Sequence, residues 1–356
     1  MPEWGAARAV FRGKEEDCVR MRRRGWFTVL ALTIVLVGGC GGADGARKAS
    51  PAFADDGRLR VATSIYPIYE FARAVGGDRI DLVNLVPPGT EPHDWEPSVG
   101  DIRTLNAAQV FLYNGAGFEH WVDKALASLD NPDLRVVEAS EGFALLEAAG
   151  HGHGHEGELV HDEHDADHAH EDADHHAHDH GDLDPHIWLD PTGAAHIVAR
   201  IRDALAAADP GNAEVYRSRA EAYLAELRAL DEAFAAGLAR CERRVFFTTH
   251  AAFGYLAHRY GLEQHAIMGL SAEAEPTPRA LKAVVEAARE HEAEYIFFET
   301  LVSDKVARVV ADEIGAEVLV LNPFEGLTPE QIAAGEDYLS VMRQNLTNLR
   351  TAMGCR

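Results

Sequence analysis

Residues 213–239 read AEVYRSRAEAYLAELRALDEAFAAGLA and predict one long amphipathic helix. Its apolar and aromatic side chains recur at steps of three and four residues, at Tyr216, Ala220, Tyr223, Leu227, Leu230 and Phe234. At 1.5 Å per residue, a helix over this segment extends roughly 40 Å. That length exceeds one small lobe, so we expect the helix to act as a strut between two.

On both sides of this helix, short apolar runs alternate with amphipathic stretches. In the first half, strands are predicted at 59–64, 80–86, 110–113 and 134–138, and helices at 68–75, 101–107, 119–128 and 194–208. In the second half, strands are predicted at 245–249, 264–268, 295–298 and 318–321, and helices at 251–260, 278–290, 304–314 and 332–353. This succession implies mostly parallel sheets flanked by helices. The predicted fold class is therefore α/β, with two lobes joined by one long helix.

A His-rich tract interrupts the first half. Eleven of the 19 histidines lie within 151–180, where they alternate with Asp and Glu. So polar a segment buries too little apolar surface to offset the entropy of ordering, which predicts a solvated insertion. Because imidazole is the commonest metal ligand, we expect this tract to collect metal ions loosely, the plain alternative being a polar linker. His186 is flanked instead by prolines and apolar residues, so we expect it to belong to a fixed site.

The N-terminal region carries a predicted export signal. Residues 22–24 are arginines, and the apolar run 26–37 is shorter than the about 20 residues that a transmembrane helix needs. The run ends at VGGC (37–40), which resembles a bacterial lipoprotein signal in which Cys40 receives the lipid. Ordinary secretion is the alternative. A start at Met21 fits the signal better, which would make 1–20 a mis-assigned extension.

Composition limits the classes of partner and the cysteine chemistry. A formal net charge of −25 argues against nucleic-acid binding, which needs a basic face. The four cysteines include no CxxC pair and no zinc-finger spacing. Outside the cytoplasm, Cys241 and Cys355 could form a disulfide, but the sequence does not determine how far apart they lie.

Four polar residues lie beyond predicted strands, where ligands bind in open α/β sheets. They are His93, His186, His250 and Glu325. Each half supplies two of them, so they could converge in a cleft between the lobes. Three imidazoles and one carboxylate suit Zn²⁺, whereas Ca²⁺ and Mg²⁺ need oxygen ligands and Mn²⁺ prefers more carboxylate. By pattern alone, each histidine is more often an ordinary surface residue.

The segments around these residues resemble the zinc-binding solute receptors of bacterial ABC metal importers. The matching segments are GTEPHDWEPS (89–98), DPHIWLDP (184–191), TTHAAFGYLAHRYGL (248–262) and LNPFEGLT (321–328). The resemblance runs from about residue 59 to 353. It implies two α/β lobes joined by a rigid helix, a metal in the cleft between them, and a His-rich loop between the first and second ligands. It also implies that His93, His186 and His250 are metal ligands.

For the fourth ligand the sequence offers several candidates. Some receptors of this kind use an Asp where this chain has Asn322, and others use the Glu of the NPxE segment, here Glu325. We favour Glu325, since a neutral amide is a poorer ligand, with water or Glu299 as alternatives. The residues predicted to support the ligands from behind are Glu91, Asp190, Glu299 and Asn322. For Asp184 and Trp188 we expect turn-building and packing.

The resemblance implies a function outside the cytoplasm. We expect a monomeric, lipid-anchored zinc-binding protein, on the outer face of the cytoplasmic membrane or in the periplasm, that delivers Zn²⁺ to an ABC permease. Mn²⁺ and Ni²⁺ are weaker candidates. One alternative is a metal-binding surface adhesin or metal buffer. Another is a zinc hydrolase, which would need an open coordination position, and the sequence has no HExxH motif. We therefore expect no enzyme activity.

These expectations divide the chain into segments. In order, we predict a possible extension (1–20), a signal peptide (21–39), a tether (40–57), a first lobe (58–190) that includes the His-rich loop (151–183), a helical connector (191–240) and a second lobe (241–356).

Overall fold

The computed structural model describes residues 53–54, 56–148, 183–272 and 276–356. The predicted signal peptide, Cys40, most of the tether and the His-rich tract at 151–180 lie outside the described residues. Contacts divide the chain into Met1–Lys48, which is also outside the described residues, and one compact unit, Ala49–Arg356. Within the part that the structure describes, no helix is both long enough and apolar enough to cross a membrane.

The first lobe contains, in chain order, β1 (Leu59–Thr63), α1 (Tyr66–Gly76), β2 (Ile80–Asn84), α2 (Val99–Ala107), β3 (Val110–Tyr113), α3 (Val122–Ala127), β4 (Arg135–Glu138) and, after the insertion, η2 (Ile187–Leu189). Its strands form one parallel sheet in the order β2-β1-β3-β4. The next helix, α4 (Pro191–Ala208), begins the predicted connector and packs on this lobe. The central strand β1 pairs on both sides, so that Val61 lies opposite Leu82 and Val110. The strands and helices confirm the βα alternation predicted from the sequence.

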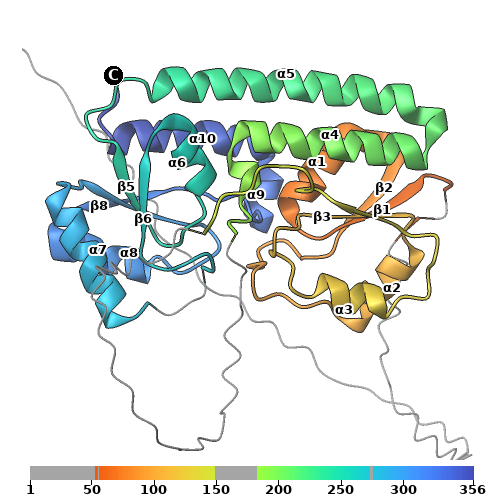
Figure 1. Cartoon of the computed structure of the whole chain (residues 1–356), viewed down its shortest axis with the longest axis horizontal. Helices are drawn as coiled ribbons and strands as arrows, with labels where there is room; N and C mark the ends of the chain where they lie inside the picture. Colours follow the sequence, from red (N-terminus) through yellow and green to blue (C-terminus); the bar gives the residue numbers. More distant parts are fainter. Residues whose placement is uncertain (1–52, 55, 149–182, 273–275) are drawn as a thin grey trace, which may run out of the picture. The chain divides into compact units, whose positions relative to one another are not determined.

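Helices cover both faces of this sheet, as Figure 1 shows for α1 and α4 on one side and α2 and α3 on the other. Side chains alternate between the faces along each strand. Val61 therefore packs in the cluster that includes α1 and α4, while its neighbour Ala62 packs with α2 and α3. Both side chains are fully buried. Burial on both faces explains why the inner strand β3 reads as a continuous apolar run, VFLY.

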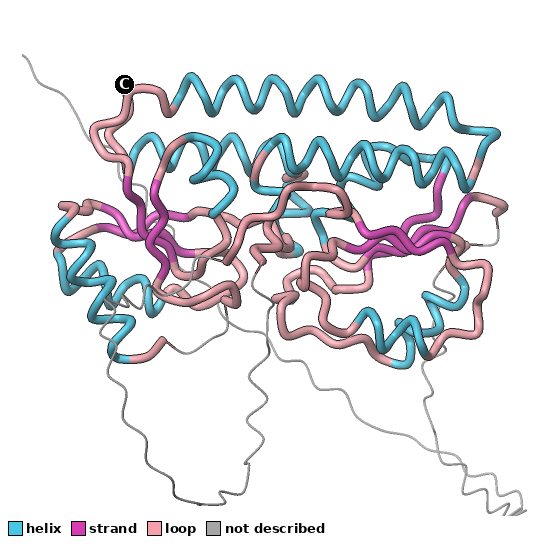
Figure 2. The backbone as a smooth tube through the Cα atoms, in the orientation of Figure 1, coloured by secondary structure: helices cyan, strands magenta, loops and turns pink. Residues whose placement is uncertain are grey.

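The predicted long helix is α5 (Ala213–Gly237), and it contacts both lobes. Near its middle, the ring of Tyr223 lies 6.0 Å from that of Phe71 in α1. Closer to its C-terminal end, Phe234 stacks on Tyr260 of α6 (Gly254–Tyr260), with ring centroids 5.3 Å apart. Figure 2 shows α5 running past the strands of both lobes. The expected strut is thus present, packed along one side on α4.

Besides α6, the second lobe contains β5 (Val245–Thr248), β6 (Glu263–Ala266), α7 (Pro278–Glu290), β7 (Tyr295–Phe298), α8 (Lys305–Ile314), β8 (Glu317–Val320), α9 (Pro329–Ala334) and α10 (Tyr338–Ala352). Its strands form two parallel pairs, β5–β6 and β7–β8, with β5 also beside β7. Phe247 packs against α7 and α8, whereas Phe246 faces the cluster that includes α6 and α10. Both lobes therefore use the same layered plan.

The prediction of one C-terminal helix over 332–353 is wrong, because α9 and α10 are separate. Gly335 ends α9 in the left-handed conformation, with φ of 78°. Asp337 then begins α10 as its N-cap, where its side chain accepts a hydrogen bond from the Ser340 backbone N–H at 2.8 Å. A left-handed glycine commonly ends a helix, and an acidic N-cap begins the next one. Together these two residues interrupt the apolar periodicity and separate α9 from α10.

The end of the chain is covalently tied to the start of the second lobe. Cys241 follows α5, Cys355 follows α10, and the two form a disulfide. Backbone hydrogen bonds from Glu242 and Arg243 to the carbonyl of Met353 connect the same two segments. The pairing that the sequence left undecided is thus present in the structure.

Candidate metal centre

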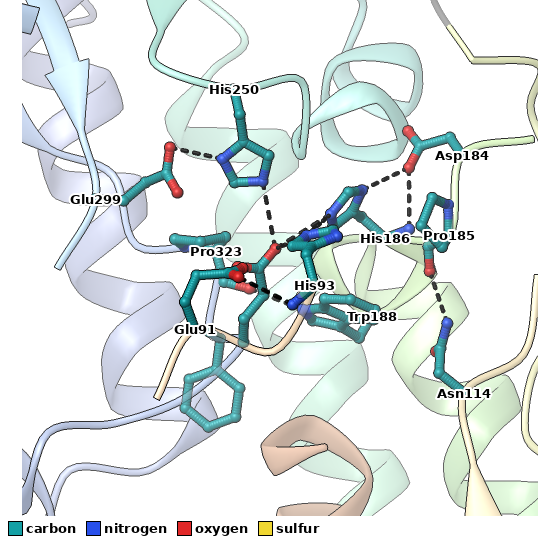
Figure 3. Close-up of polar contacts among 12 residues, drawn as sticks. Glu91, His93, Asn114, Asp184, Pro185, His186, Trp188, His250, Glu299 and Pro323 are labelled. Carbon is teal, nitrogen blue, oxygen red and sulfur yellow. Dashed lines mark hydrogen bonds and ion pairs between the residues drawn. The ribbon is translucent and has the colours of Figure 1, made fainter. Parts of the chain in front are cut away.

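Four side chains meet at one buried point: His93, His186, His250 and Glu325. Each offers one ligand atom, and these atoms all lie within 4.8 Å of one another. The Nε2 atoms of the three histidines lie 3.2, 3.1 and 3.3 Å from Oε1 of Glu325, respectively. No more than 2% of the surface of any of the four residues is exposed. Figure 3 shows the three labelled imidazoles turned toward one another.

The parallel strands explain how distant residues arrive at this point. His93 lies in the loop after β2, His250 follows β5, and Glu325 follows β8. The carboxyl ends of parallel strands meet at one edge, which gathers such loops. His186 is different, because it precedes η2 and follows the insertion. An antiparallel bridge between Glu147 and Leu183 closes the base of that insertion and returns the chain to the site.

The His186 ring is oriented by Asp184. The Asp184 carboxylate accepts a hydrogen bond from Nδ1 of His186 at 2.8 Å and another from its backbone N–H at 2.9 Å. This hydrogen bond places the proton of a neutral ring on Nδ1 and leaves the lone pair of Nε2 available to bind a metal. A Cβ on Gly254 would lie 2.5 Å from Oδ2 of Asp184, so the glycine makes room for the carboxylate. The predicted turn-building role for Asp184 is therefore incomplete, since its main contact is with the His186 ring.

Glu299 takes the corresponding position behind His250. Its Oε1 atom lies 2.6 Å from Nδ1 of His250, and the same carboxylate accepts a hydrogen bond from the Thr249 hydroxyl. Figure 3 shows Glu299 on the side of the His250 ring away from the other histidines. Glu299 thus lies where a supporting acceptor belongs, and it is not among the four converging groups.

Glu91 supports the loop that carries His93. Its Oε2 accepts a hydrogen bond from the His93 backbone N–H at 3.0 Å. Burial, followed by repulsion from Glu325, raises the pKa of Glu91 to about 8. Asp190, which we also expected behind a ligand, has another role. It accepts from the Thr192 backbone N–H at 2.7 Å as the N-cap of α4 and pairs with Arg259 at 3.3 Å.

Asn322 shapes the turn that presents Glu325. Its side-chain oxygen accepts from the Phe324 backbone N–H at 2.8 Å, and Phe324 has a positive φ of 57°. Such a conformation is costly for a bulky residue and persists only where its surroundings fix it. The indole Nε1 of Trp188 donates to the carbonyl of Pro323 at 2.8 Å, tying the first lobe to this turn. The amide of Asn322 is therefore occupied within the turn, away from ligation.

The electrostatics of the four groups favour a cation. Burial opposes the ionisation of Glu325, but the neighbouring histidines outweigh it and hold its pKa well below the ordinary range. Burial also opposes protonation of His250, yet Glu299 and Glu325 raise its pKa well above 6.5. Asp184 and Glu325 likewise overcome burial and raise the pKa of His186, whereas burial dominates at His93 and lowers its pKa. The carboxylate of Glu325 thus favours positive charge on His186 and His250, and a bound cation would take the place of that charge.

The donor set fits a tetrahedral zinc ion. Zinc binds imidazole nitrogen and carboxylate oxygen at about 2.0–2.2 Å, which places neighbouring ligand atoms of a tetrahedron about 3.4 Å apart. The separations of 3.1–3.3 Å between the histidine Nε2 atoms and Glu325, and of 3.4 Å between Nε2 of His93 and His186, are close to that value. Four of the six ligand–ligand separations therefore match a tetrahedral site with three nitrogens and one oxygen, and all six lie within 4.8 Å.

Comparison with known proteins gives the family. The profile described as zinc-uptake complex component A, periplasmic (ZnuA), matches residues 61–352. The chain is 38% identical over 325 residues to the high-affinity zinc uptake system protein ZnuA of Bacillus subtilis, covering 91% of this chain and 96% of that one. It is 39% identical over 295 residues to the zinc-binding lipoprotein AdcA of Streptococcus pneumoniae, covering 83% of this chain.

The solved structures agree with this match. The Zn(II)-bound ZnuA-like domain of Streptococcus pneumoniae AdcA superimposes with a TM-score of 0.67 at 37% identity, covering 83% of this chain and 99% of that domain. The chain spans about half the length of the whole AdcA proteins, 56% of the pneumococcal one. From the matched residues and their identity to these relatives, the chain belongs to the ZnuA family of zinc-uptake components.

Proposed function

We propose that this protein captures Zn²⁺ outside the cytoplasm through His93, His186, His250 and Glu325 and delivers it to an ABC permease. The observation that carries the proposal is the convergence of these four buried groups within 4.8 Å. Two come from each lobe, so a bound ion would join the lobes. Relatives described as zinc-binding or zinc-uptake proteins support zinc as the transported ion.

The location and the partner follow from the same proposal. Residues 21–39 act as the export signal, Cys40 carries a lipid, and 40–57 tether the folded part to the outer face of the cytoplasmic membrane. The first lobe (58–190), connector (191–240) and second lobe (241–356) then work as one monomeric receptor. The relative named a zinc-binding lipoprotein supports the anchor. The name "zinc-uptake complex component" supports a membrane partner.

A hydrolase is a weaker interpretation of the same residues. Catalytic zinc keeps three protein ligands and an open position for water, whereas here a carboxylate accompanies three histidines. All four groups are buried, which limits access of a substrate bond to the ion. Hydrolysis of an ester or peptide panel, abolished by His186→Ala, would favour the enzyme. An adhesin or metal buffer remains the other alternative, and adhesion independent of bound metal would favour it.

Titration of the metal-free protein with Zn²⁺ against a competing chelator tests the proposal. We expect one tight zinc, lost in His250→Ala. His258→Ala is the matched control, because His258 is an exposed histidine in the helix that follows the same loop. Cells that depend on this protein and its permease should lose growth in low zinc with the first variant only. Tight zinc binding by His250→Ala would refute the assigned site.

A further inference from the structure

A tight turn after β3 brings the Asn114–Glu119 loop back toward the metal centre. Three successive residues, Gly115, Ala116 and Gly117, have positive φ values of 83°, 53° and 79°. The Phe118 backbone N–H closes the turn by donating to the Gly115 carbonyl at 3.1 Å. With its φ of 83°, Gly115 has a conformation that favours glycine, and a Cβ there would also lie 2.2 Å from Oε1 of Glu138. A non-glycine residue with positive φ inside such a turn indicates a conformation fixed by its surroundings.

The carboxylate of Glu119 holds this loop in place. Its Oε1 accepts from the Ser64 hydroxyl at 2.6 Å and from the Asn114 backbone N–H at 2.8 Å, and its Oε2 accepts from the Gly115 N–H at 2.9 Å. Ser64 follows β1 and Asn114 follows β3, so one buried carboxylate joins the ends of two strands. Hydrogen bonds to an ionised carboxylate are stronger than neutral ones. The loop is therefore rigidly attached to the sheet.

The loop places the ring of Phe118 in contact with two of the histidines. The Phe118 ring centroid lies 4.5 Å from that of His93, at an interplanar angle of 44°, and 6.1 Å from that of His186, nearly edge-on at 88°. Trp188 supports Phe118 from another side at 5.6 Å. The side-chain amide of Asn114 donates to the carbonyl of Pro185 at 3.0 Å, directly before His186 (Figure 3). One loop thus restrains both histidines that the first lobe supplies.

We propose that Phe118 determines metal specificity by fixing the ring planes of His93 and His186 for a four-coordinate ion. The inference rests on the proposed function, since it concerns the ion held by the same four groups. Glu119 acts through Phe118 as a positioning residue. The site would then favour Zn²⁺ over Mn²⁺ and Ni²⁺ for two reasons: its donor atoms, and the fixed orientation of the two imidazoles that Phe118 contacts.

The physical reason is the difference in preferred coordination. Zn²⁺ has no geometric preference from its d electrons and accepts a tetrahedron of nitrogen and oxygen ligands. Six-coordinate ions need ligands near right angles and two further donors. The contacts of Phe118 with both imidazoles oppose their rearrangement to such angles, and Phe118, with only 1% of its surface exposed, fills the space beside them. A smaller side chain at this position would free both the rings and that space.

Phe118→Leu in the otherwise unchanged protein tests the proposal, with Phe71→Leu as the matched control. Phe71 is another fully buried phenylalanine of the first lobe, and its ring contacts Tyr223 and Tyr338. We expect Phe118→Leu to lower the ratio of Zn²⁺ to Mn²⁺ affinity by about tenfold, the lower end of the loss in metal affinity that follows removal of a hydrogen-bonded partner of a ligand. Phe71→Leu should lower stability and leave the ratio unchanged. The His-rich tract is identical in the unaltered protein and in both variants. Ions that it binds weakly therefore affect all three measurements equally.

Cobalt provides a readout that a general loss of packing does not change. Tetrahedral Co²⁺ absorbs visible light strongly and octahedral Co²⁺ weakly, so Phe118→Leu should lose the intense bands that the control retains. Glu119→Gln is a second test, since it loosens the loop while leaving the Phe118 side chain in place, and the same changes are expected. An unchanged affinity ratio and cobalt spectrum in both variants, with tight zinc binding intact, overturn this inference alone. Absence of tight zinc binding in the unaltered protein overturns the proposed function as well.

Discussion

Nδ1 of His250 lies 2.6 Å from Oε1 of Glu299, while Nε2 of the same ring lies 3.3 Å from Oε1 of Glu325. The imidazole is thus placed between two carboxylates in a fully buried setting. Although burial opposes a charged ring, the two acids raise the pKa of His250 well above 6.5. We therefore expect the ring to hold a proton near neutral pH in the metal-free protein, so that an entering metal ion would displace it.

Zinc binding at neutral pH should release about one proton or more. Ligation needs a neutral imidazole, so the proton held by His250 leaves as the ion enters. Calorimetric titrations in buffers of different ionisation enthalpy measure the number released. Glu299→Gln should reduce it, because the pKa of His250 falls when one of the two charges is removed. Equal heats in all buffers would contradict the protonated ring.

The same pair should make the metal-free protein sensitive to alkaline pH. A histidine whose pKa is raised on folding stabilises the protein fully below the unfolded pKa, about 6.5, and this contribution disappears as pH rises through the folded value. The melting temperature of the metal-free protein should therefore fall above neutral pH by more than that of Glu299→Gln.

Zinc-loaded protein should show the opposite trend, since acid returns protons to the ligands and releases the ion. Zinc retention that stays flat down to about pH 4 would argue against three histidine ligands.

Asp184→Ala should weaken zinc binding by about 10–100-fold, the range typical of residues that orient a metal-binding histidine. The carboxylate holds Nδ1 of His186 at 2.8 Å, and without it the ring is free to turn and to change tautomer. Asp190→Ala is the control, because Asp190 caps α4 and should cost stability, about 1 kcal/mol, while zinc affinity is kept. Equal zinc affinities for the two variants would show that the Asp184 contact does not orient the ligand.

The sequence predicted the convergence of the site because the fold gathers strand ends. His93, His250 and Glu325 each follow a predicted strand, and the carboxyl ends of parallel strands meet at one edge. The structure brings them together with His186. The apolar periodicity was likewise enough to predict α5, whose observed end lies two residues before the predicted one.

The supporting contacts were harder to predict because they depend on side-chain direction. In the sequence, Asp184-Pro185 reads as a turn, and only the space left by Gly254, in the other lobe, allows the carboxylate to contact His186. An aspartate two residues before a candidate ligand was the one available signal. Asp190, by contrast, has the position and type of a helix cap, and that local role is the one it takes.

Deletion of residues 152–181 should leave one tight zinc and remove several weak ones. The four converging groups lie outside the deleted segment, and the bridge between Glu147 and Leu183 closes its base within the described residues. A preformed site holds an ion more tightly than a tract that each ion must order. Metal content after dialysis against chelators of graded strength separates the two classes. Loss of the tight ion in the deletion would contradict the assignment of His93, His186 and His250.

The Cys241–Cys355 disulfide should stabilise the second lobe without affecting the metal. The bond spans 114 residues of sequence, and closing a loop of this size stabilises a protein by about 2–5 kcal/mol. Replacing both cysteines by serine should lower the free energy of unfolding in that range and leave zinc affinity unchanged. Reducing agent should reproduce the effect in the unaltered protein and have none in the double variant. A melting temperature insensitive to both changes would show that the bond adds no stability.

Glu325→Ala should weaken zinc binding more than any variant of the supporting residues. Zn²⁺ and three neutral imidazoles place two positive charges in a buried site, and burying unpaired charge is costly. The carboxylate removes half of that charge and supplies an oxygen ligand. Asn322 cannot substitute for it, since its side chain is bonded within the turn. Glu299 already contacts the far side of His250.

The comparison that decides the role of Glu325 uses three alanine variants and one glutamine. Glu325→Ala should exceed the about 10–100-fold loss expected for Glu299→Ala and Asn322→Ala, while three histidines still retain some zinc. Glu325→Gln keeps an oxygen donor without the charge, so its affinity should fall between Glu325→Ala and the unaltered protein. Because Glu325 also raises the pKa of His250, the alanine variant should release fewer protons on binding zinc. An unchanged affinity in Glu325→Ala would leave three histidines and water as the ligand set.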